Sequence, residues 1–387
     1  MRVKSAALKN FDGYLNFNLS KTNTESMKYS GSLVSELWNI LEYYSEIDEA
    51  GKKLILSNGG KQKDLKILQQ ILKARLRQAK NYYSSAQNLP NKSSPVLYYY
   101  SFYNLVCAYL VTKGIKITSK KCNHGLSYKY EQLGSKFTQE KIQIRNNPDI
   151  NNIFPMFYEK MFNKRISISS IKITNLISYC TDIAYQFSNS GFGHIKIYPS
   201  NLVILDKKER KKAWVLFAVP SSLNVSNYSK SFKNLIKLFR EVTIDQHQAK
   251  TLFDFNPNNM KFFKYYQSEW EYNLMGNDSL PYWQIVSRLN QDFGNVYQSN
   301  YFEDSTNLYF LAPLQKNNQQ PFNETLAIYS TMYYLSSIIR YKPEYLEKIY
   351  SNKEMWLINA FIQSCPSTFL RAMTSLITNK DYVLSMR

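Results

Sequence analysis

Apolar residues recur at helical spacing in the first third of the chain. In residues 64–88 they step by three or four positions and form one narrow stripe, which comprises Leu65, Leu68, Leu72, Leu76, Ala79, Tyr83 and Ala86. This period predicts an amphipathic helix that buries the stripe. Residues 32–46 have the same spacing and predict a shorter helix before it. Residues 1–30 are polar and show no period, so we expect an irregular lead-in.

A second long helix is predicted after a short polar turn. Residues 95–112 are 18 positions without a charge, which borders on the length of a membrane span. The segment contains five tyrosines, with Ser101 and Asn104 in its middle, and tyrosine favours the membrane interface over the bilayer centre. We therefore expect a buried core helix, antiparallel to residues 64–88, and no membrane contact.

The pattern changes after residue 113. We expect a loop over residues 117–147 and mixed helix over residues 150–188. Alternation predicts a hairpin from residues 194–205 and 214–220 and a second strand pair from residues 295–301 and 307–312. Helical spacing returns in five segments: residues 232–241, 261–272, 324–340, 342–351 and 355–377.

These elements predict a mainly α protein with a smaller β-containing middle portion, an α+β fold with helical N-terminal and C-terminal parts. A chain of 387 residues is long enough for more than one domain. We divide it into a polar lead-in, a basic helical domain, an α+β middle portion and C-terminal helices that pack back on the core: residues 1–30, 31–188, 189–320 and 321–387.

The formal charge of +20 is concentrated in one part of the sequence. Residues 51–250 contain 33 Lys and Arg against 10 Asp and Glu, whereas the segments on either side are close to neutral. A concentrated positive field attracts polyanions and speeds their capture. The sequence therefore predicts nucleic acid or another polyanion as a partner, although an acidic protein subunit fits the same charge.

One basic group lies beside the stripe of the helix predicted at residues 64–88. Helical spacing places four cations on an adjacent face: Lys66, Lys73, Arg77 and Lys80. They form either a ridge that faces a polyanion or the solvated flank of a core helix.

The loop after the second helix contains the most suggestive local chemistry. His124 follows two lysines and precedes Gly125, and such a histidine can act as general acid or base beside a phosphate. Lys141 and Arg145 are the candidates to stabilise the phosphate charge. The other basic residues here are candidate polyanion ligands: Lys120, Lys121 and Lys129. The alternative is a structural loop whose histidine caps a helix or bonds to the backbone.

A weaker catalytic candidate is the pair Arg240 and His247. Their separation resembles the Arg–x(4–6)–His signature of HEPN-type ribonucleases, in which these two residues act on the RNA phosphate. Glu241 follows the arginine, where those motifs usually have a small polar residue.

Several other classes of protein lack their motifs here. The four cysteines are scattered without a CxxC pair, and three histidines leave little for a zinc site, so we expect no metal. No GxGxxG, P-loop, GxSxG or HExxH motif occurs, so no nucleotide cofactor is predicted. No apolar run of signal-peptide length follows the basic start, and we expect a cytoplasmic protein.

The sequence resembles the YaaC-like family of bacterial proteins. The resemblance lies in ordered segments that contain its tyrosine run, its His-Gly pair and its Arg-Tyr segment: residues 79–83, 94–100, 105–112, 124–125, 139–143 and 335–341. The family's basic run after His-Gly is reduced here to Ser127, Tyr128 and Lys129. The resemblance implies a shared architecture and gives weight to His124, Gly125, Lys141 and Arg340.

Three functions are consistent with these features. The first is binding of RNA or DNA by the basic region, as the effector or partner subunit of a bacterial anti-phage system, with metal-independent phosphodiester cleavage around His124. The second is a non-enzymatic subunit that docks an acidic protein partner. The third is binding of a small anionic nucleotide.

Overall fold

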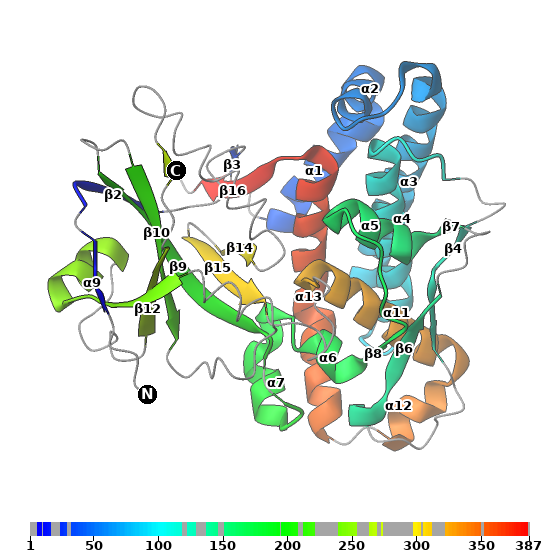
Figure 1. Cartoon of the computed structure of the whole chain (residues 1–387). Coiled ribbons are helices and arrows are strands. Elements are labelled where there is room, and N and C mark those ends of the chain that lie inside the picture. The colour runs from blue at the N-terminus through cyan, green and yellow to red at the C-terminus, as the bar shows by residue number, and fades with distance from the viewer. Residues whose placement is uncertain are drawn as a thin grey trace. The chain divides into compact units, whose positions relative to one another are not determined.

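A computed structural model gives the fold of the chain (Figure 1). It describes residues 6–9, 11–16, 24–28, 32–117, 122–128, 137–145, 151–193, 195–207, 212–220, 239–253, 263–268, 272–273, 297–302, 305–311, 322–349 and 352–385. The chain divides into two compact units. One is a sheet unit made of Met1–Thr22 and Lys196–Pro321, and the other is a helical unit made of Asn23–Ile195 and Phe322–Arg387.

The N-terminal helices of the helical unit follow the apolar pattern. They are α1 (Leu33–Glu46), α2 (Asp48–Ser57), α3 (Leu65–Gln87) and α4 (Ser94–Thr112). The side chain of Ser32 caps α1 by accepting a hydrogen bond from the backbone N–H of Ser35. All seven residues of the predicted stripe of α3 are buried. These observations confirm the helices predicted at residues 32–46, 64–88 and 95–112.

Helix α4 lies at the centre of the helical unit. Fifteen of its 19 residues are buried, because it packs against α3, α5, α11 and α13 on different sides. A helix surrounded by others needs no polar stripe, which explains its uncharged sequence. Among the described residues, no helix combines the length and apolar character that crossing a bilayer requires.

The C-terminal helices pack against this core. They are α11 (Glu324–Tyr341), α12 (Pro343–Ile349) and α13 (Asn352–Thr378). Phe369 of α13 stacks on Phe102 of α4 with 4.0 Å between ring centroids. The side chain of Asn323 caps α11 by accepting a hydrogen bond from the N–H of Leu326. Residues more than 200 positions apart thus share one core.

The prediction of a loop after α4 is wrong. The described residues there form β4 (Cys122–Asn123), β5 (Leu126–Tyr128), a short helix at Phe137–Gln139 and β6 (Lys141–Ile144). Strand β6 pairs antiparallel with β5 and with β8 (Ser170–Lys172), while β4 pairs parallel with β7 (Asn151–Asn152). Strands of two to four residues are too short to show an alternation in the sequence.

The segment between these strands and the sheet unit is mainly helical, as predicted. It contains α5 (Ile153–Phe162), α6 (Ile173–Ile177), a short helix at Thr181–Ile183, and α7 (Ala184–Ser190).

The expectation of an irregular lead-in is also wrong where residues 1–30 are described. Three strands lie there: β1 (Ala6–Ala7), β2 (Gly13–Asn16) and β3 (Thr24–Lys28). Strand β3 pairs in parallel with β16 (Asp381–Ser385), near the other end of the sequence. These strands form because they pair with distant strands. Their polar sequence has no local pattern that would predict a strand.

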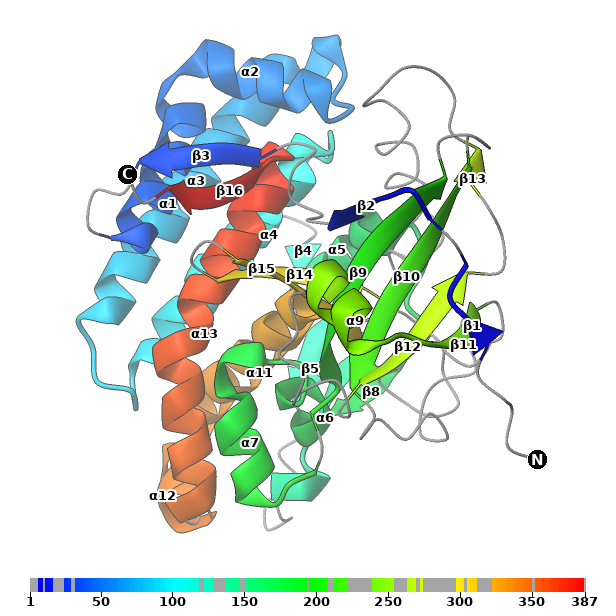
Figure 2. The same cartoon turned by 90° about the vertical axis from the view of Figure 1, so that its left-hand side faces the viewer.

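The described residues of the sheet unit form a nine-stranded sheet (Figure 2). The order is β1-β11-β12-β10-β9-β15-β14, with β13 beside β10 and β2 beside β9. The predicted hairpin is confirmed as β9 (Ile197–Lys207) and β10 (Lys212–Pro220), and the second pair as β14 (Tyr297–Phe302) and β15 (Ser305–Leu311).

Two helices predicted in this unit are corrected to strands where their residues are described. Residues 232–238 of the first lie outside the described residues. Residues 261–272 contain β12 (Phe263–Ser268) and the start of β13 (Tyr272–Asn273), and residues 239–241 belong to β11 (Phe239–Thr243). Strand β12 lies between β10 and β11, and its last four residues are buried on both faces. A strand buried on both faces shows no alternation of apolar and polar residues, so its sequence pattern does not distinguish it from a helix.

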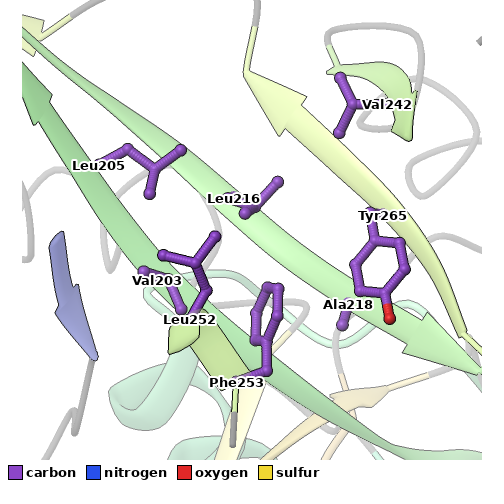
Figure 3. Packing of buried hydrophobic residues seen from close by; sticks show 8 residues of the cluster. All are labelled: Val203, Leu205, Leu216, Ala218, Val242, Leu252, Phe253 and Tyr265. Atoms are coloured by element: carbon purple, nitrogen blue, oxygen red, sulfur yellow. The ribbon is translucent and has the colours of Figure 1, made fainter. Parts of the chain in front are cut away.

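Helix α9 (Gln246–Phe253) covers one part of this sheet. Its Leu252 and Phe253 lie against side chains of β9, β10 and β12, as Figure 3 shows. Together with these two residues, six others form one buried hydrophobic cluster: Val203, Leu205, Leu216, Ala218, Val242 and Tyr265. The sheet unit therefore has a hydrophobic core of its own.

Candidate functional site

The backbone around His124 is held on both sides. The N–H of Phe154, at the start of α5, donates to the carbonyl of His124, and the N–H of Arg145, after β6, donates to the carbonyl of Gly125. Gly125 has a φ of +75°, which disfavours residues with a Cβ. A Cβ at this position would also lie only 2.5 Å from Cδ of Pro155. Glycine is thus required here, and it fixes the direction of His124.

The imidazole of His124 lies among tyrosines of two helices. Tyr99 of α4 shares a hydrogen bond between its hydroxyl and Nδ1 of His124. The ring of Tyr103, one helical turn further on, meets the imidazole edge-on at 5.0 Å, and Tyr333 of α11 lies 6.2 Å away. Within the described residues, no hydrogen bond occupies Nε2 of His124. Tyr99 therefore anchors one of the two imidazole nitrogens.

Burial favours the neutral form of His124 over the cation. It lowers the pKa of His124, and the positive charge of Arg340 lowers that pKa further. Histidine ordinarily titrates near pH 6.5, so His124 is neutral at pH 7 and can accept a proton.

Arg340 lies in the last turn of α11, among aromatic rings. Its Nη1 donates to the hydroxyl of Tyr100 at 3.0 Å, and its Nε donates to the carbonyl of Ser336 at 3.2 Å. The guanidinium also lies 5.6 Å from the ring centroid of Tyr100 and 5.0 Å from that of Tyr341. The helix turn and the tyrosine hydroxyl therefore hold the cation in place.

Two further arginines lie around the same rings. Arg75 of α3 donates to the amide oxygen of Asn104 at 3.0 Å and lies 5.9 Å from the ring of Tyr103. Arg145 is exposed, and its charge acts on Tyr333. Burial raises the pKa of Tyr333, and the positive charges of Arg340 and Arg145 oppose that rise.

We call these residues the aromatic–arginine cluster: Tyr100, Tyr103, His124, Tyr333, Arg75, Arg145 and Arg340. In the part of the chain that the structure describes, none of its three arginines forms an ion pair with a carboxylate. Tyr100, Tyr103, His124 and Arg340 are all partly exposed. The cluster thus offers aromatic rings and unneutralised positive charge at one place on the surface.

The predicted basic ridge of α3 has a different environment. Lys73, Arg77 and Lys80 pair with acidic residues of the preceding helices: Glu42, Glu46 and Asp48. The guanidinium of Arg77 donates to Glu46 at 2.8 Å and holds the pKa of that carboxyl at about 2. Lys66 is exposed. Ion pairs within the protein therefore largely neutralise the charge of three of the four ridge cations.

The other sequence candidates are only partly brought together. Arg145 is joined to Gly125 through the backbone, whereas Lys141 lies four residues earlier, about 13 Å along the strand. Lys141 therefore does not share the position of Arg145 beside His124. Lys120, Lys121 and Lys129 lie outside the described residues.

Arg240 and His247 are not joined by a hydrogen bond within the described residues. Arg240, in β11, donates to the side chain of Gln267 at 2.8 Å and to the carbonyl of Ala7 at 3.3 Å. His247 is exposed in α9. The guanidinium thus binds groups of its own sheet.

Sequence reasoning missed the tyrosines and Arg75. The run Tyr98-Tyr99-Tyr100 with Tyr103 was interpreted only as core, although a buried tyrosine hydroxyl needs a hydrogen-bond partner. That requirement is a signal for a polar site beside α4. Among the described residues, no group of three or more His, Cys, Asp and Glu is arranged to hold a metal ion.

Comparison with known proteins identifies the family. No curated protein and no solved structure matches the chain. A family model described as YaaC-like Protein matches residues 46–377, a range that contains the whole aromatic–arginine cluster. Because this match covers most of the sequence, the chain belongs to the YaaC-like protein family.

Proposed function

We propose that this protein binds nucleic acid, RNA or DNA, at the aromatic–arginine cluster. The observation that supports this best is the set of three arginines without carboxylate partners, interleaved with partly exposed tyrosines. Arginine binds phosphate oxygens, and bases stack on aromatic rings with about 1–3 kcal/mol per base. The basic excess of residues 51–250 would draw the same ligand to the surface.

The proposed reaction is metal-independent cleavage of RNA. Neutral His124 would accept the proton of a 2′-hydroxyl, and the resulting oxygen would attack the adjacent phosphorus. The bond to the 5′-oxygen breaks, and that oxygen takes a proton from water, leaving a 2′,3′-cyclic phosphate and a 5′-hydroxyl. Arg145 and Arg340 would stabilise the negative charge that develops on the phosphate.

The test of binding compares two charge-neutralising variants. Fluorescence anisotropy with labelled RNA and DNA oligonucleotides is measured for Arg340→Gln and for Lys66→Gln, which removes a cation from the α3 ridge. We expect Arg340→Gln to weaken binding about tenfold, equivalent to about 1.4 kcal/mol, and Lys66→Gln to change it less than twofold. Equal effects would move the site to the ridge, and no binding by the native protein would refute the proposal.

The test of cleavage uses His124→Gln. Gel analysis of labelled RNA should show a cyclic-phosphate product with the native protein, no product with the variant, and none from a 2′-O-methyl substrate. Retained binding without cleavage by the native protein would leave a binding protein and reject the reaction.

The alternative functions give different results in a pull-down of the native protein with and without nuclease. A nuclease-insensitive acidic partner without bound nucleic acid would favour a docking subunit. Stabilisation by a mononucleotide alone in a thermal-shift assay would favour a small-nucleotide binder. The proposed role in anti-phage defence is tested separately, by phage plaque counts on cells that carry the native protein or His124→Gln.

A further inference from the structure

The outer face of strand β6, together with Arg145 directly after the strand, carries a row of basic residues. Lys141 and Arg145 are exposed, while Ile142 and Ile144 between them are buried, so the strand presents its cations on one side. Gln143, on the same side, is partly exposed. This alternation places Lys141 and Arg145 on the same side of the strand, about 13 Å apart along its direction.

The neighbouring strand adds a like charge where it is least favourable. Lys172 of β8 is the direct cross-strand partner of Lys141, and both side chains are exposed. Like charges directly opposite one another destabilise an antiparallel pair. Within the described residues neither lysine forms an ion pair with a carboxylate. A repulsive pair of this kind is expected where an anion occupies the face.

The acid next to this row does not neutralise it. Glu140, which immediately precedes β6, is fully buried. Its carboxylate accepts hydrogen bonds from the hydroxyls of Tyr128 and Tyr345, the latter at 2.6 Å. Its carboxylate is therefore bonded inside the protein, and among the described residues it forms no ion pair with Lys141 or Lys172.

The row also leads to the aromatic–arginine cluster. Arg145 is bonded through its backbone to Gly125, and its charge acts on Tyr333. The basic face, which comprises Lys141, Arg145 and Lys172, is thus joined to the cluster at Arg145. The only residue shared by the face and the cluster is Arg145.

We propose that this basic face binds the phosphate backbone of a single-stranded nucleic acid whose adjoining nucleotides occupy the cluster. The inference rests on the proposed function, because the cluster would hold the bases. A single strand is required, since stacking on tyrosine needs unpaired bases whose faces are free. Lysine contacts phosphate as a point charge without reading the base, so this part of the site should be indifferent to sequence.

The experiment varies the length of the ligand. Anisotropy is measured with oligouridylate of three and ten nucleotides, with ten-nucleotide oligothymidylate and with a ten-base-pair DNA duplex. The proteins are the native chain, the double variant Lys141→Gln/Lys172→Gln, the single variant Arg340→Gln, and the control Lys164→Gln, which changes an exposed lysine outside both sites.

We expect the double variant to bind both ten-nucleotide single strands about tenfold more weakly, with a salt slope reduced by about 1.4, and to bind the trinucleotide as the native protein does. Arg340→Gln should weaken all three single strands, and Lys164→Gln none. Equal losses for RNA and DNA indicate backbone contact, whereas a loss for RNA alone would assign the lysines to the 2′-hydroxyl and contradict a pure backbone site.

The two proposals fail in distinguishable ways. If the double variant binds the ten-nucleotide strands as tightly as the native protein while Arg340→Gln weakens them, the basic face is rejected and the cluster stands. If Arg340→Gln has no effect on any ligand, the proposed function itself is rejected. Tighter binding of the duplex than of the single strands would also overturn the inference. Both lysines are exposed, and a melting temperature no lower than that of the native protein checks that the double variant is folded.

Discussion

At the scale of single residues, one backbone angle positions His124. Gly125→Ala introduces a Cβ at a φ of +75° and 2.5 Å from Pro155. Gly191 is the matched control, because it has the same φ but nothing within 4 Å of an added Cβ. We expect Gly191→Ala to lose about 1–2 kcal/mol of unfolding free energy in urea, and Gly125→Ala about 1–3 kcal/mol more. Equal losses would show that the contact with Pro155 is relieved without cost.

The protonation of His124 gives a second prediction at this scale. Its pKa in the folded protein lies below 6.5, through burial and the charge of Arg340, while the tyrosines that face it stay neutral at pH 7. The unfolded chain therefore binds the proton more tightly, and stability falls as pH drops below about 6.5. NMR titration of the imidazole should show this low pKa, and Arg340→Gln should raise it. A pKa at or above 6.5 would contradict the burial of the ring.

At the scale of elements, the cross-strand pair Lys141–Lys172 of β6 and β8 predicts that a substitution will stabilise the protein. Lys172→Glu replaces a like-charge pair with an opposite-charge pair facing Lys141. We expect the variant to gain about 0.2–1 kcal/mol of unfolding free energy at low salt and to lose that gain at high salt. Lys164→Glu, outside a strand, should show no such gain. A destabilised Lys172→Glu protein would mean that an internal group already compensates for Lys172.

The ion pairs between α1 and α3 predict part of the acid sensitivity. The hydrogen bond from Arg77 holds the pKa of Glu46 at about 2, below its unfolded value near 4.3. Its contribution is therefore present above pH 4.3 and is lost as pH falls towards 2. Glu46→Gln should make denaturant unfolding less pH-dependent across that window, whereas Glu49→Gln should not. Identical pH profiles for the native protein and Glu46→Gln would show that this pair does not stabilise the fold.

The same elements show what the sequence could and could not predict. The stripe of α3 and the uncharged α4 predicted their helices because one side, or every side, is buried by neighbours. Strand β12 was mistaken for a helix because it is covered on both faces, and β3 was missed because its partner β16 lies more than 350 residues away. The His-Gly loop was found from local chemistry. Arg75 and Tyr333 lie near this loop only because their helices pack beside it, and no local sequence pattern predicts that packing.

At the scale of the whole molecule, each unit is formed by two separate segments of the chain. The strands β1 and β2 belong to the sheet unit, β3 belongs to the helical unit, and residues 196–321 are inserted between the two parts of the helical unit. Every residue of the aromatic–arginine cluster and of the basic face lies in the helical unit. The proposed site therefore depends on one core, and the sheet unit has another.

This separation predicts which core substitutions affect binding. Leu252→Ala removes a fully buried side chain from the core between α9 and the sheet, and Leu105→Ala does the same in α4. Each should cost about 2–5 kcal/mol of stability. Because Leu105 shares a helix with Tyr100 and Tyr103, its loss should also weaken binding of a ten-nucleotide single strand, whereas Leu252→Ala should leave the affinity unchanged at a temperature where both proteins remain folded. Weaker binding by Leu252→Ala would place part of the nucleic-acid site on the sheet unit.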